Sequence, residues 1–516
     1  MENKRESVLK GIISLLISQV FIKIIGLIYK LYLTNREGFG DSGNAIYSSG
    51  FQIYALLLTF SSTGVPNAIS YLVSERLAVG DNKGAHKIFK IAFVTFALIG
   101  IMGSLLLFAG AETISNKWIQ IPEAKYSLIA LSPSIFFVSI TSVIRGYFNG
   151  RQSFSVTAKS QTIEQIFKTV FTVSLVELVV ILGKQNTEIM AASANMATTV
   201  ATVSSFIYIF IYYRTKRKEI GQEIFETVNY KPTRIRKTLK KIINVAIPIS
   251  ISSLISSFGK NIDSFTIVRF LKNYLTEQEA KIQYGILSGK IDSLCSLPFA
   301  FNVAFVTTLV PSISKSMAKG DLEEVAKKAE KYILISILIA FPIASTMFIY
   351  PNEILKILFP NAPSGAMYLK ISSITIVFML LAQTINGVLQ GIGKVNIPAI
   401  SFGIGMIVKF LCNIILIPNK QIGIYGAIIG NILCNILACI ISSCVLIKNI
   451  KLKINLKKLM IKPLLATICM NIISIVLYNN LKCIKSGYLA IIVTLMVSYL
   501  IYLILIIIFK IYPLKK

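Results

Sequence analysis

Long apolar stretches separated by short polar segments dominate the pattern of this chain. A helix of roughly 20 mostly apolar residues crosses a bilayer core of about 30 Å. Fourteen stretches come close to or exceed that length: 11–34, 45–66, 88–110, 126–145, 160–182, 188–213, 240–268, 284–310, 331–350, 367–390, 395–417, 423–447, 461–481 and 487–509. The short alternating strands of a membrane barrel do not fit this pattern. The sequence therefore predicts an all-α polytopic membrane protein with about 14 transmembrane helices.

Composition points to the same fold class. Of the 516 residues, 54% are hydrophobic and only 15% are charged, whereas a soluble protein must cover its exterior with polar groups. The first stretch contains Lys23 and Lys30 and lacks a small-residue cleavage site, so we interpret it as a retained helix and not as a secretory signal peptide. No loop is long enough to form a separate soluble domain.

The formal net charge of +30 is divided unevenly between the two sides of the predicted membrane. The N-terminus, the loops after even-numbered helices and the C-terminus hold 34 lysines and arginines, and the loops of the other side hold 11. Short loops rich in lysine and arginine stay cytoplasmic. We therefore predict a cell-membrane protein with both termini in the cytoplasm, and we attribute the positive charge to topology rather than to nucleic-acid binding.

Segments from the two halves of the chain resemble each other. Residues 144–150 and 385–391 both carry the pattern G-x-x-(N/Q)-G at the end of a predicted helix, and the same shift of 241 residues brings Lys168 onto Lys409. A looser match needs a gap of five residues and pairs Val65-Pro66 and Gly80-Asp81 with Val310-Pro311 and Gly320-Asp321. The alternative is that these glycines only allow close helix packing.

The repeat predicts how the chain is divided. The matching segments close helices that are six apart and run in the same direction, which is a parallel repeat. We predict a six-helix bundle over 1–213, a basic cytoplasmic linker over 214–241, a second six-helix bundle over 242–447, and two additional helices within 448–516. Two parallel bundles around a cavity form a transporter architecture.

Charged side chains inside the predicted helices are costly, and they usually face a cavity or a partner. Twelve charged residues lie inside the predicted helices, and eight of them are basic. The twelve are Lys23, Lys30, Arg145, Glu164, Lys168, Glu177, Lys260, Asp263, Lys290, Asp292, Lys370 and Lys409. A cavity lined by them is net positive and suits an anionic group such as a diphosphate. The candidate substrate-binding residues are Lys23, Lys30, Arg145, Lys260 and Lys290. The candidate coupling-ion residues are Asp263 and Glu177.

Structural roles are the alternative for several of these residues. Glu164 and Lys168 are spaced i, i+4, and Lys260 and Asp263 i, i+3, so each pair is expected to neutralise itself on one helix face. Arg145 lies close enough to a helix end for its side chain to reach the interface. Glu177 has no lysine within a helical turn, which favours it as a proton site.

Cofactor chemistry leaves no pattern in the sequence. The chain has one histidine and seven cysteines, with no C-x-x-C pair. The outer loops are short and show no catalytic constellation. We therefore expect no cofactor, no metal site and no enzymatic activity.

Three segments resemble a known family: 64–70, 80–88 and 145–168. They are similar to the stage V sporulation protein B and YtgP branch of the MurJ and polysaccharide-exporter flippases, in the multidrug/oligosaccharidyl-lipid/polysaccharide (MOP) superfamily. The resemblance extends over essentially the whole chain. It implies a flippase that moves a polyprenyl-diphosphate-linked glycan, lipid II first of all, from the inner to the outer leaflet by alternating access. The implied partners are the lipid-linked oligosaccharide, membrane lipids and cell-wall synthesis enzymes.

One departure from that family concerns the second helix. In relatives that act on lipid II, basic residues of the first, second and eighth helices line the cavity. By position, Lys23, Lys30 and Lys290 match the first and eighth helices, but residues 45–66 contain no lysine or arginine and only Gln52 as a sizeable polar group. Other lipid-linked glycans therefore stay open as substrates. The alternatives are a cation-coupled multidrug exporter of the same superfamily and a membrane glycosyltransferase.

The charge distribution generates a test of topology. Reporter fusions after Lys241 and after Lys462 should read as cytoplasmic, and fusions near Asn186 and Lys420 should read as external, because the first two follow the basic loops. Paired phosphatase and fluorescent-protein reporters measure this directly. A consistently external signal after Lys241 would overturn the fourteen-helix arrangement.

Overall fold

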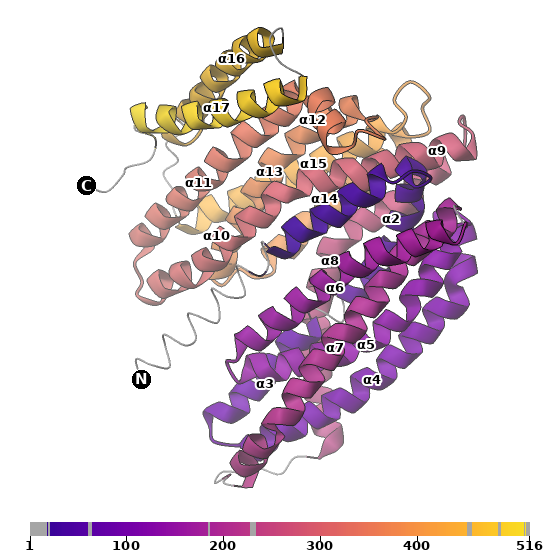
Figure 1. Cartoon of the computed structure of the whole chain (residues 1–516). Coiled ribbons are helices and arrows are strands. Elements are labelled where there is room, and N and C mark those ends of the chain that lie inside the picture. Colours follow the sequence, from indigo (N-terminus) through magenta and orange to yellow (C-terminus); the bar gives the residue numbers. More distant parts are fainter. Residues whose placement is uncertain are drawn as a thin grey trace. The chain divides into compact units, whose positions relative to one another are not determined.

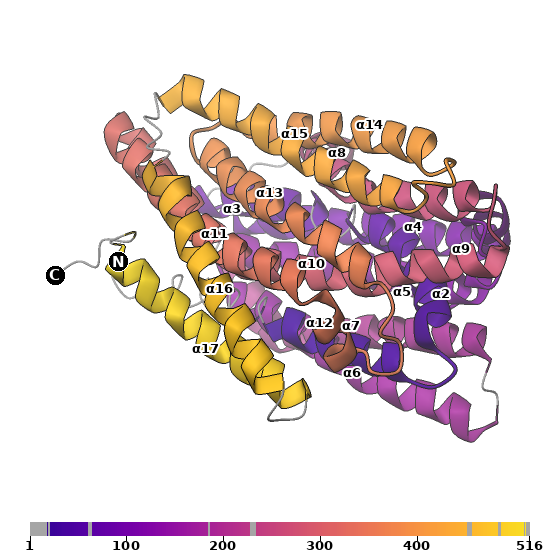
Figure 2. The same cartoon turned by 90° about the horizontal axis from the view of Figure 1, so that it is seen from above.

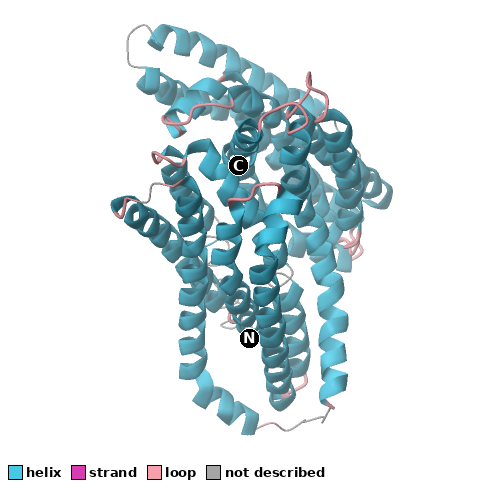
Figure 3. Ribbon diagram, turned by 90° about the vertical axis from the view of Figure 1, so that its right-hand side faces the viewer, coloured by secondary structure: helices cyan, strands magenta, loops and turns pink. Residues whose placement is uncertain are grey.

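The computed structural model describes residues 18, 21–59, 64–183, 186–225, 227, 234–450, 457–482, 487–509 and 511 of the chain. Within these ranges the chain consists of helices joined by loops and turns, and it forms no strand (Figure 3). The predicted fold class is confirmed. Nine of the described helices are long and apolar enough to cross a membrane, so the count of fourteen stays a prediction.

The chain folds into two compact units, residues 1–285 and 286–516. The first unit begins with a helix over residues 21–35. Its further α-helices, labelled in Figures 1 and 2, are α2 (Gly40–Thr59), α3 (Val65–Ala78), α4 (Asn82–Thr113), α5 (Ala124–Gly150), α6 (Phe154–Ile181), α7 (Thr187–Phe225), α8 (Ile235–Leu271) and α9 (Glu277–Tyr284). The short π-helix η2 (Ile114–Ile119) follows α4.

The second unit continues from the short π-helix η3 (Gly285–Ile291), which begins at the last residue of the first unit. Its other helices are α10 (Asp292–Ala318), α11 (Leu322–Ile349), α12 (Pro351–Leu358), α13 (Ala366–Gly391), α14 (Ile397–Leu416), α15 (Tyr425–Ile450), η4 (Lys457–Ile461), α16 (Lys462–Lys482) and α17 (Gly487–Ile508). The two C-terminal helices, α16 and α17, lie side by side (Figures 1 and 2).

The nine apolar helices carry few of the embedded charges. Of the twelve charged positions predicted inside the membrane, only Arg145, Lys370 and Lys409 lie on them. The others belong to residues 21–35, α6, α8, η3 and α10. Charge lowers the hydropathy of a helix, so the helices outside the nine are the ones that hold the candidate site.

The same turn recurs in the two units. Gly80 and Gly320 adopt positive φ angles of 75° and 73°, a conformation that glycine adopts without steric cost. The aspartate that follows each glycine begins the next helix, since the side chains of Asp81 and Asp321 accept hydrogen bonds of 2.7 and 2.8 Å from the amide three residues on. These are N-caps, and they occur 240 residues apart.

The repeated glycines mediate equivalent helix contacts, α5 on α3 in the first unit and α13 on α10 in the second. An added Cβ would come within 2.6 to 2.8 Å of the neighbouring helix at all four, so only glycine allows this approach. The contacts pair Gly146 with Pro66, Gly150 with Val73, Gly387 with Val306, and Gly391 with Ile313. Close packing and repetition are therefore both present, whereas the sequence left them as alternatives.

These contacts correct one predicted match. Positions in α3 recur 240 residues later in α10, and the two glycine-aspartate turns keep the same shift. Val65-Pro66 therefore corresponds to residues near Val306. The match with Val310-Pro311 was wrong, because it followed a shared dipeptide instead of the contact register, and the five-residue gap is not needed.

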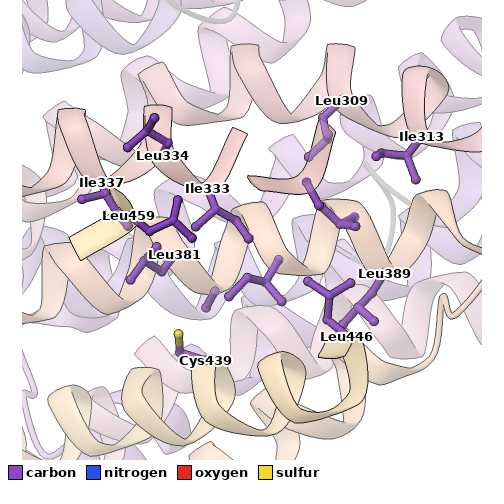
Figure 4. Packing of buried hydrophobic residues seen from close by; sticks show 14 of the residues in the cluster. Leu309, Ile313, Ile333, Leu334, Ile337, Leu381, Leu389, Cys439, Leu446 and Leu459 are labelled. Carbon is purple, nitrogen blue, oxygen red and sulfur yellow. The ribbon is translucent and has the colours of Figure 1, made fainter. Parts of the chain in front are cut away.

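Each unit has its own apolar core. In the first unit, buried side chains of α3, α4, α5 and α7 pack together, among them Ile69, Phe89, Tyr147 and Ile209. In the second unit, Figure 4 shows the cluster formed by α10, α11, α13 and α15 with Leu459 of η4. α8 packs against α2, α3 and α4 of the first unit. The predicted division into bundles over 1–213 and 242–447 stays a prediction.

The contact of Gly146 with Pro66 predicts a strong effect of one added methyl group. Gly146→Ala would place its Cβ 2.8 Å from the Pro66 carbonyl oxygen, and backbone cannot yield as a flexible side chain can. We expect a loss of about 1–3 kcal/mol, as for other overpacked positions, measured by thermal unfolding in detergent. Gly221→Ala, at an exposed position of α7, is the control, because its Cβ meets nothing within 4 Å. Equal stability of the two variants would refute the packing role.

Candidate functional site

The candidate site lies where residues 21–35 run alongside α6. The contact begins near the start of α6, where the Ser18 and Thr162 hydroxyl oxygens are 2.6 Å apart, and ends near its other terminus, where Tyr32 donates a hydrogen bond to Glu177. Both helices therefore run in the same direction. α2 also packs against residues 21–35 and runs antiparallel to them, because Thr34 contacts Asn44 and Lys30 contacts Ser48.

Two lysines are buried at the middle of this arrangement. Lys30 and Lys168 are 6% and 7% exposed, and Lys168 lies halfway along the 28 residues of α6. At 1.5 Å per residue that is about 20 Å from the start of the helix, which corresponds to the middle of a bilayer. The two ammonium groups lie close enough to repel each other.

Aromatic rings, not carboxylates, surround these ammonium groups. Lys30 Nζ lies 4.8 Å from the centre of the Tyr47 ring, and Lys168 Nζ lies 4.1 Å from Phe51 and 5.2 Å from Tyr29. The Tyr47 and Phe51 rings stack with an interplanar angle of 8°. Ring faces attract cations without neutralising them. Among the described residues no carboxylate lies beside either ammonium group, so the site offers positive charge to an anion.

The expected pairing of Lys168 with Glu164 is wrong. Glu164 instead forms an ion pair of 2.7 Å with Arg145 of α5, because a long guanidinium on a neighbouring helix reaches it. Arg145 also donates to the hydroxyl groups of Ser160 and Ser205 at 2.9 and 2.8 Å. Arg145, a predicted substrate-binding residue, is thus buried and neutralised by described groups.

The expectation of an unpaired Glu177 is also wrong. Arg36 forms an ion pair with it at 2.9 Å, and Tyr32 donates a further hydrogen bond to it. Both partners lie after the predicted end of the first helix or close to it. Sequence spacing could not find them, because they come from a different helix. Glu177 therefore joins two helices at one end of the site.

The other predicted site residues differ in their surroundings. Lys23 lies on the same helix as Lys30, two turns earlier, and is exposed. Asp263 is buried within α8. The side chain of Lys260 lies outside the described residues. The assignment of these three residues to substrate or ion binding stays a prediction.

Lys290 is fully buried in the second unit. Its ammonium donates to the carbonyl oxygens of Ala362 and Ser364 at 2.7 and 2.9 Å and to the Ser364 hydroxyl at 3.1 Å. These contacts tie the loop after α12 to η3. In this structure Lys290 stabilises a loop, and its predicted substrate role would require these hydrogen bonds to exchange.

Lys168 lies in the candidate site but is not among the substrate-binding residues predicted from the sequence. Two features of the sequence point to Lys168. It lies in the middle of a predicted helix, and aromatic residues that can surround an ammonium group occur at Tyr29 and, with i, i+4 spacing on the second helix, at Tyr47 and Phe51. The equivalent residue of the repeat, Lys409, is likewise buried, at 3% exposure. Among the described residues, no group of three or more histidine, cysteine, aspartate or glutamate side chains could hold a metal ion.

Comparison with known proteins decides the family. The model of the polysaccharide biosynthesis protein family matches residues 8–317, which is more than half of the chain. The chain belongs to this family. A second model, MatE, matches residues 288–415 of this family member.

Curated relatives and solved structures agree with this assignment. The family member is 22% identical to stage V sporulation protein B of Bacillus subtilis (strain 168), over 90% of this chain and 88% of the relative. It is 25% identical to the lipid II flippase MurJ of the same organism, over 82% and 80%. The solved inward closed conformation of lipid II flippase MurJ shares its fold, with a TM-score of 0.69 at 17% identity over 96% of this chain and 99% of that one. The predicted resemblance is confirmed, and the family member is a multi-pass transporter or flippase of the MOP superfamily.

The two kinds of embedded charge predict opposite effects on stability. Glu164→Gln leaves the buried Arg145 charge uncompensated, which costs up to about 3–5 kcal/mol in a fully buried pair and less here, because the Glu164 side chain is 28% exposed. Lys168→Met removes one of two repelling charges and should leave stability unchanged or raise it. Thermal unfolding of both purified variants tests this. A Lys168→Met variant less stable than Glu164→Gln would mean that Lys168 is a structural cation.

Proposed function

We propose that this chain is a flippase that carries a polyprenyl-diphosphate-linked glycan from the inner to the outer leaflet of the cell membrane by alternating access, with lipid II as the first substrate to test. The observation that carries the proposal is the pair Lys30 and Lys168, buried together without a described carboxylate beside either ammonium. The proposal also includes the predicted orientation, with both termini in the cytoplasm.

The cost of these lysines supports a role in binding. A lysine near the bilayer centre costs about 2.5–3.5 kcal/mol on insertion scales. Lys168 lies halfway along α6, whereas Lys30 lies five residues before the end of its helix and costs less, although neighbouring like charges also repel each other. Arg145 and Glu177 each form an ion pair with a residue of opposite charge. Lys30 and Lys168 differ from them, because no described carboxylate lies beside either ammonium group. A diphosphate supplies the two negative charges that this site lacks, through charge-assisted hydrogen bonds.

Lys168 also supports lipid II despite the uncharged second helix. In the resembling flippases a basic residue of that helix lines the cavity, and here α2 has none. The ammonium of Lys168 nevertheless lies 4.1 Å from the ring centre of Phe51, on α2. α6 thus supplies a positive charge at the surface of α2. Lys23, on the helix of Lys30 and exposed, is proposed to meet the headgroup first.

A multidrug exporter is the second candidate, favoured by the match of the MatE model to residues 288–415. A carrier of cationic drugs needs accessible carboxylates in its cavity. Both glutamates of α6 are instead held by arginines, Glu164 by Arg145 and Glu177 by Arg36. A positively charged site repels cationic drugs, and we therefore place this function second.

Transport of labelled lipid II in proteoliposomes tests the proposal. Lys30→Met and Lys168→Met should each lower the flipping rate about 10- to 150-fold, since a hydrogen bond to a charged group contributes about 1.5–3 kcal/mol. The arginine variants should keep part of the activity, because the charge remains while its shape changes. Lys159→Met, at an exposed position of α6, is the control. Its flipping rate should equal that of the unmodified protein.

Two outcomes would contradict the proposal. Normal flipping by folded Lys30→Met and Lys168→Met proteins would remove the diphosphate site. Export of a cationic dye by protein that moves no lipid-linked sugar would favour the multidrug exporter. A second lipid-linked glycan, tested in the same vesicles, separates loss of the site from the wrong choice of glycan.

A further inference from the structure

The corner formed by the end of α8 and α9 is fastened to the segment that joins α4 to α5. Lys281 of α9 is only 4% exposed, and its ammonium forms ion pairs with Glu123 at 2.5 Å and with Glu277 at 2.8 Å. Glu123 lies directly before α5 and Glu277 begins α9. The ion pair between Lys281 and Glu123 therefore connects two helical corners that are 158 residues apart in sequence.

Two further contacts join the same corners. Arg269 near the end of α8 donates a 2.7 Å hydrogen bond to the carbonyl oxygen of Lys117. The ring of Trp118 meets that of Phe265 edge to face, with centroids 6.3 Å apart. The topology of the chain predicts that all these residues lie on the external side.

A backbone contact seats the same corner on α2. A Cβ at Gly285 would lie only 1.9 Å from the carbonyl oxygen of Asp41, so the end of α9 touches the start of α2 without an intervening side chain. Deeper along the seam, the Ser264 hydroxyl donates to Gln52 at 2.9 Å. α8 and α9 are thus held along α2 by groups that separate without breaking a covalent bond.

The energetics of the ion pairs suit repeated opening. The hydrogen bond from Lys281 lowers the pKa of Glu277, which keeps that carboxylate ionised at neutral pH. The second oxygen of Glu123 is buried without a hydrogen-bond partner among the described residues. Both glutamate side chains are partly exposed, Glu123 at 33% and Glu277 at 41%, and solvent weakens an ion pair of this kind. Water can therefore replace these ion-pair contacts when the two corners separate.

We propose that Lys281, Glu123 and Arg269 form a clasp that closes the external side of the transporter and releases in every transport cycle. The repeat assigns α8 to the second bundle, so its attachment to α2 and to the α4–α5 segment is an attachment between the two predicted bundles. The proposal rests on the alternating access of the proposed function, but it does not depend on which substrate is carried.

Labelling of a buried reporter tests the clasp. Ser264→Cys, 1% exposed in the native side chain, is placed in a protein whose own cysteines are replaced, and intact cells are treated with a membrane-impermeant maleimide. Lys281→Glu and Glu123→Lys should each raise the labelling rate at least fivefold. The double variant Lys281→Glu/Glu123→Lys should return at least half of the way to the parent rate. Gly285→Ala, which disturbs the seam sterically, should also raise labelling.

The matched control is Lys125→Glu. Lys125 forms an ion pair with Glu112 at 2.8 Å beside the same α4–α5 segment, but this pair does not reach α8 or α9. Its reversal should leave labelling unchanged. Unchanged labelling in both single variants, or a double variant as open as the singles, would overturn the clasp. If the single variants label faster but the parent protein does not flip lipid II, the clasp proposal holds and the proposed substrate is refuted.

Discussion

The high free energy of a charge in hydrocarbon determines how the embedded part of this protein is built. Several of the described embedded charges are compensated by protein groups, and the compensating groups differ. Arg145 pairs with Glu164, Glu177 pairs with Arg36, and Lys290 is hydrogen-bonded by loop carbonyls. Lys30 and Lys168 receive only aromatic faces and a hydroxyl contact. The helices that carry Lys30 and Lys168 are not among the nine described helices that are long and apolar enough to cross a membrane, and they form the candidate site.

The sequence predicted the helices well, because hydropathy over about 20 residues reports directly on the solvent that surrounds a helix. Fourteen predicted stretches overlap helices wherever the chain is described. The helical turns at Asp81 and Asp321 also follow from local chemistry, since an aspartate after a left-handed glycine caps the next helix. Interactions of this kind join residues that are close together in the sequence, so the sequence pattern alone can predict them.

The pairing of charges could not be predicted in the same way. Spacing along one helix paired Glu164 with Lys168 and left Glu177 alone, whereas both glutamates have arginine partners on other helices. An i, i+4 pair contributes only about 0.2–0.5 kcal/mol, so a guanidinium that approaches from a neighbouring helix easily replaces it. Lys30 is predicted from the sequence as a substrate-binding residue; the structure buries it, and its role in binding stays a prediction. Lys168 was not selected, because its assigned partner made it look neutral.

The shared position of Lys168 and Lys409 has a consequence for the history of the chain. Both lysines are buried, and the repeat places them at equivalent positions of two helices. A repeat of this kind points to duplication of a shorter gene, whose product would have paired with a second copy of itself. Each copy would then have carried one such lysine, and the ancestral pair would have been symmetric in charge. The two lysines now belong to one polypeptide, in which each position can change without the other.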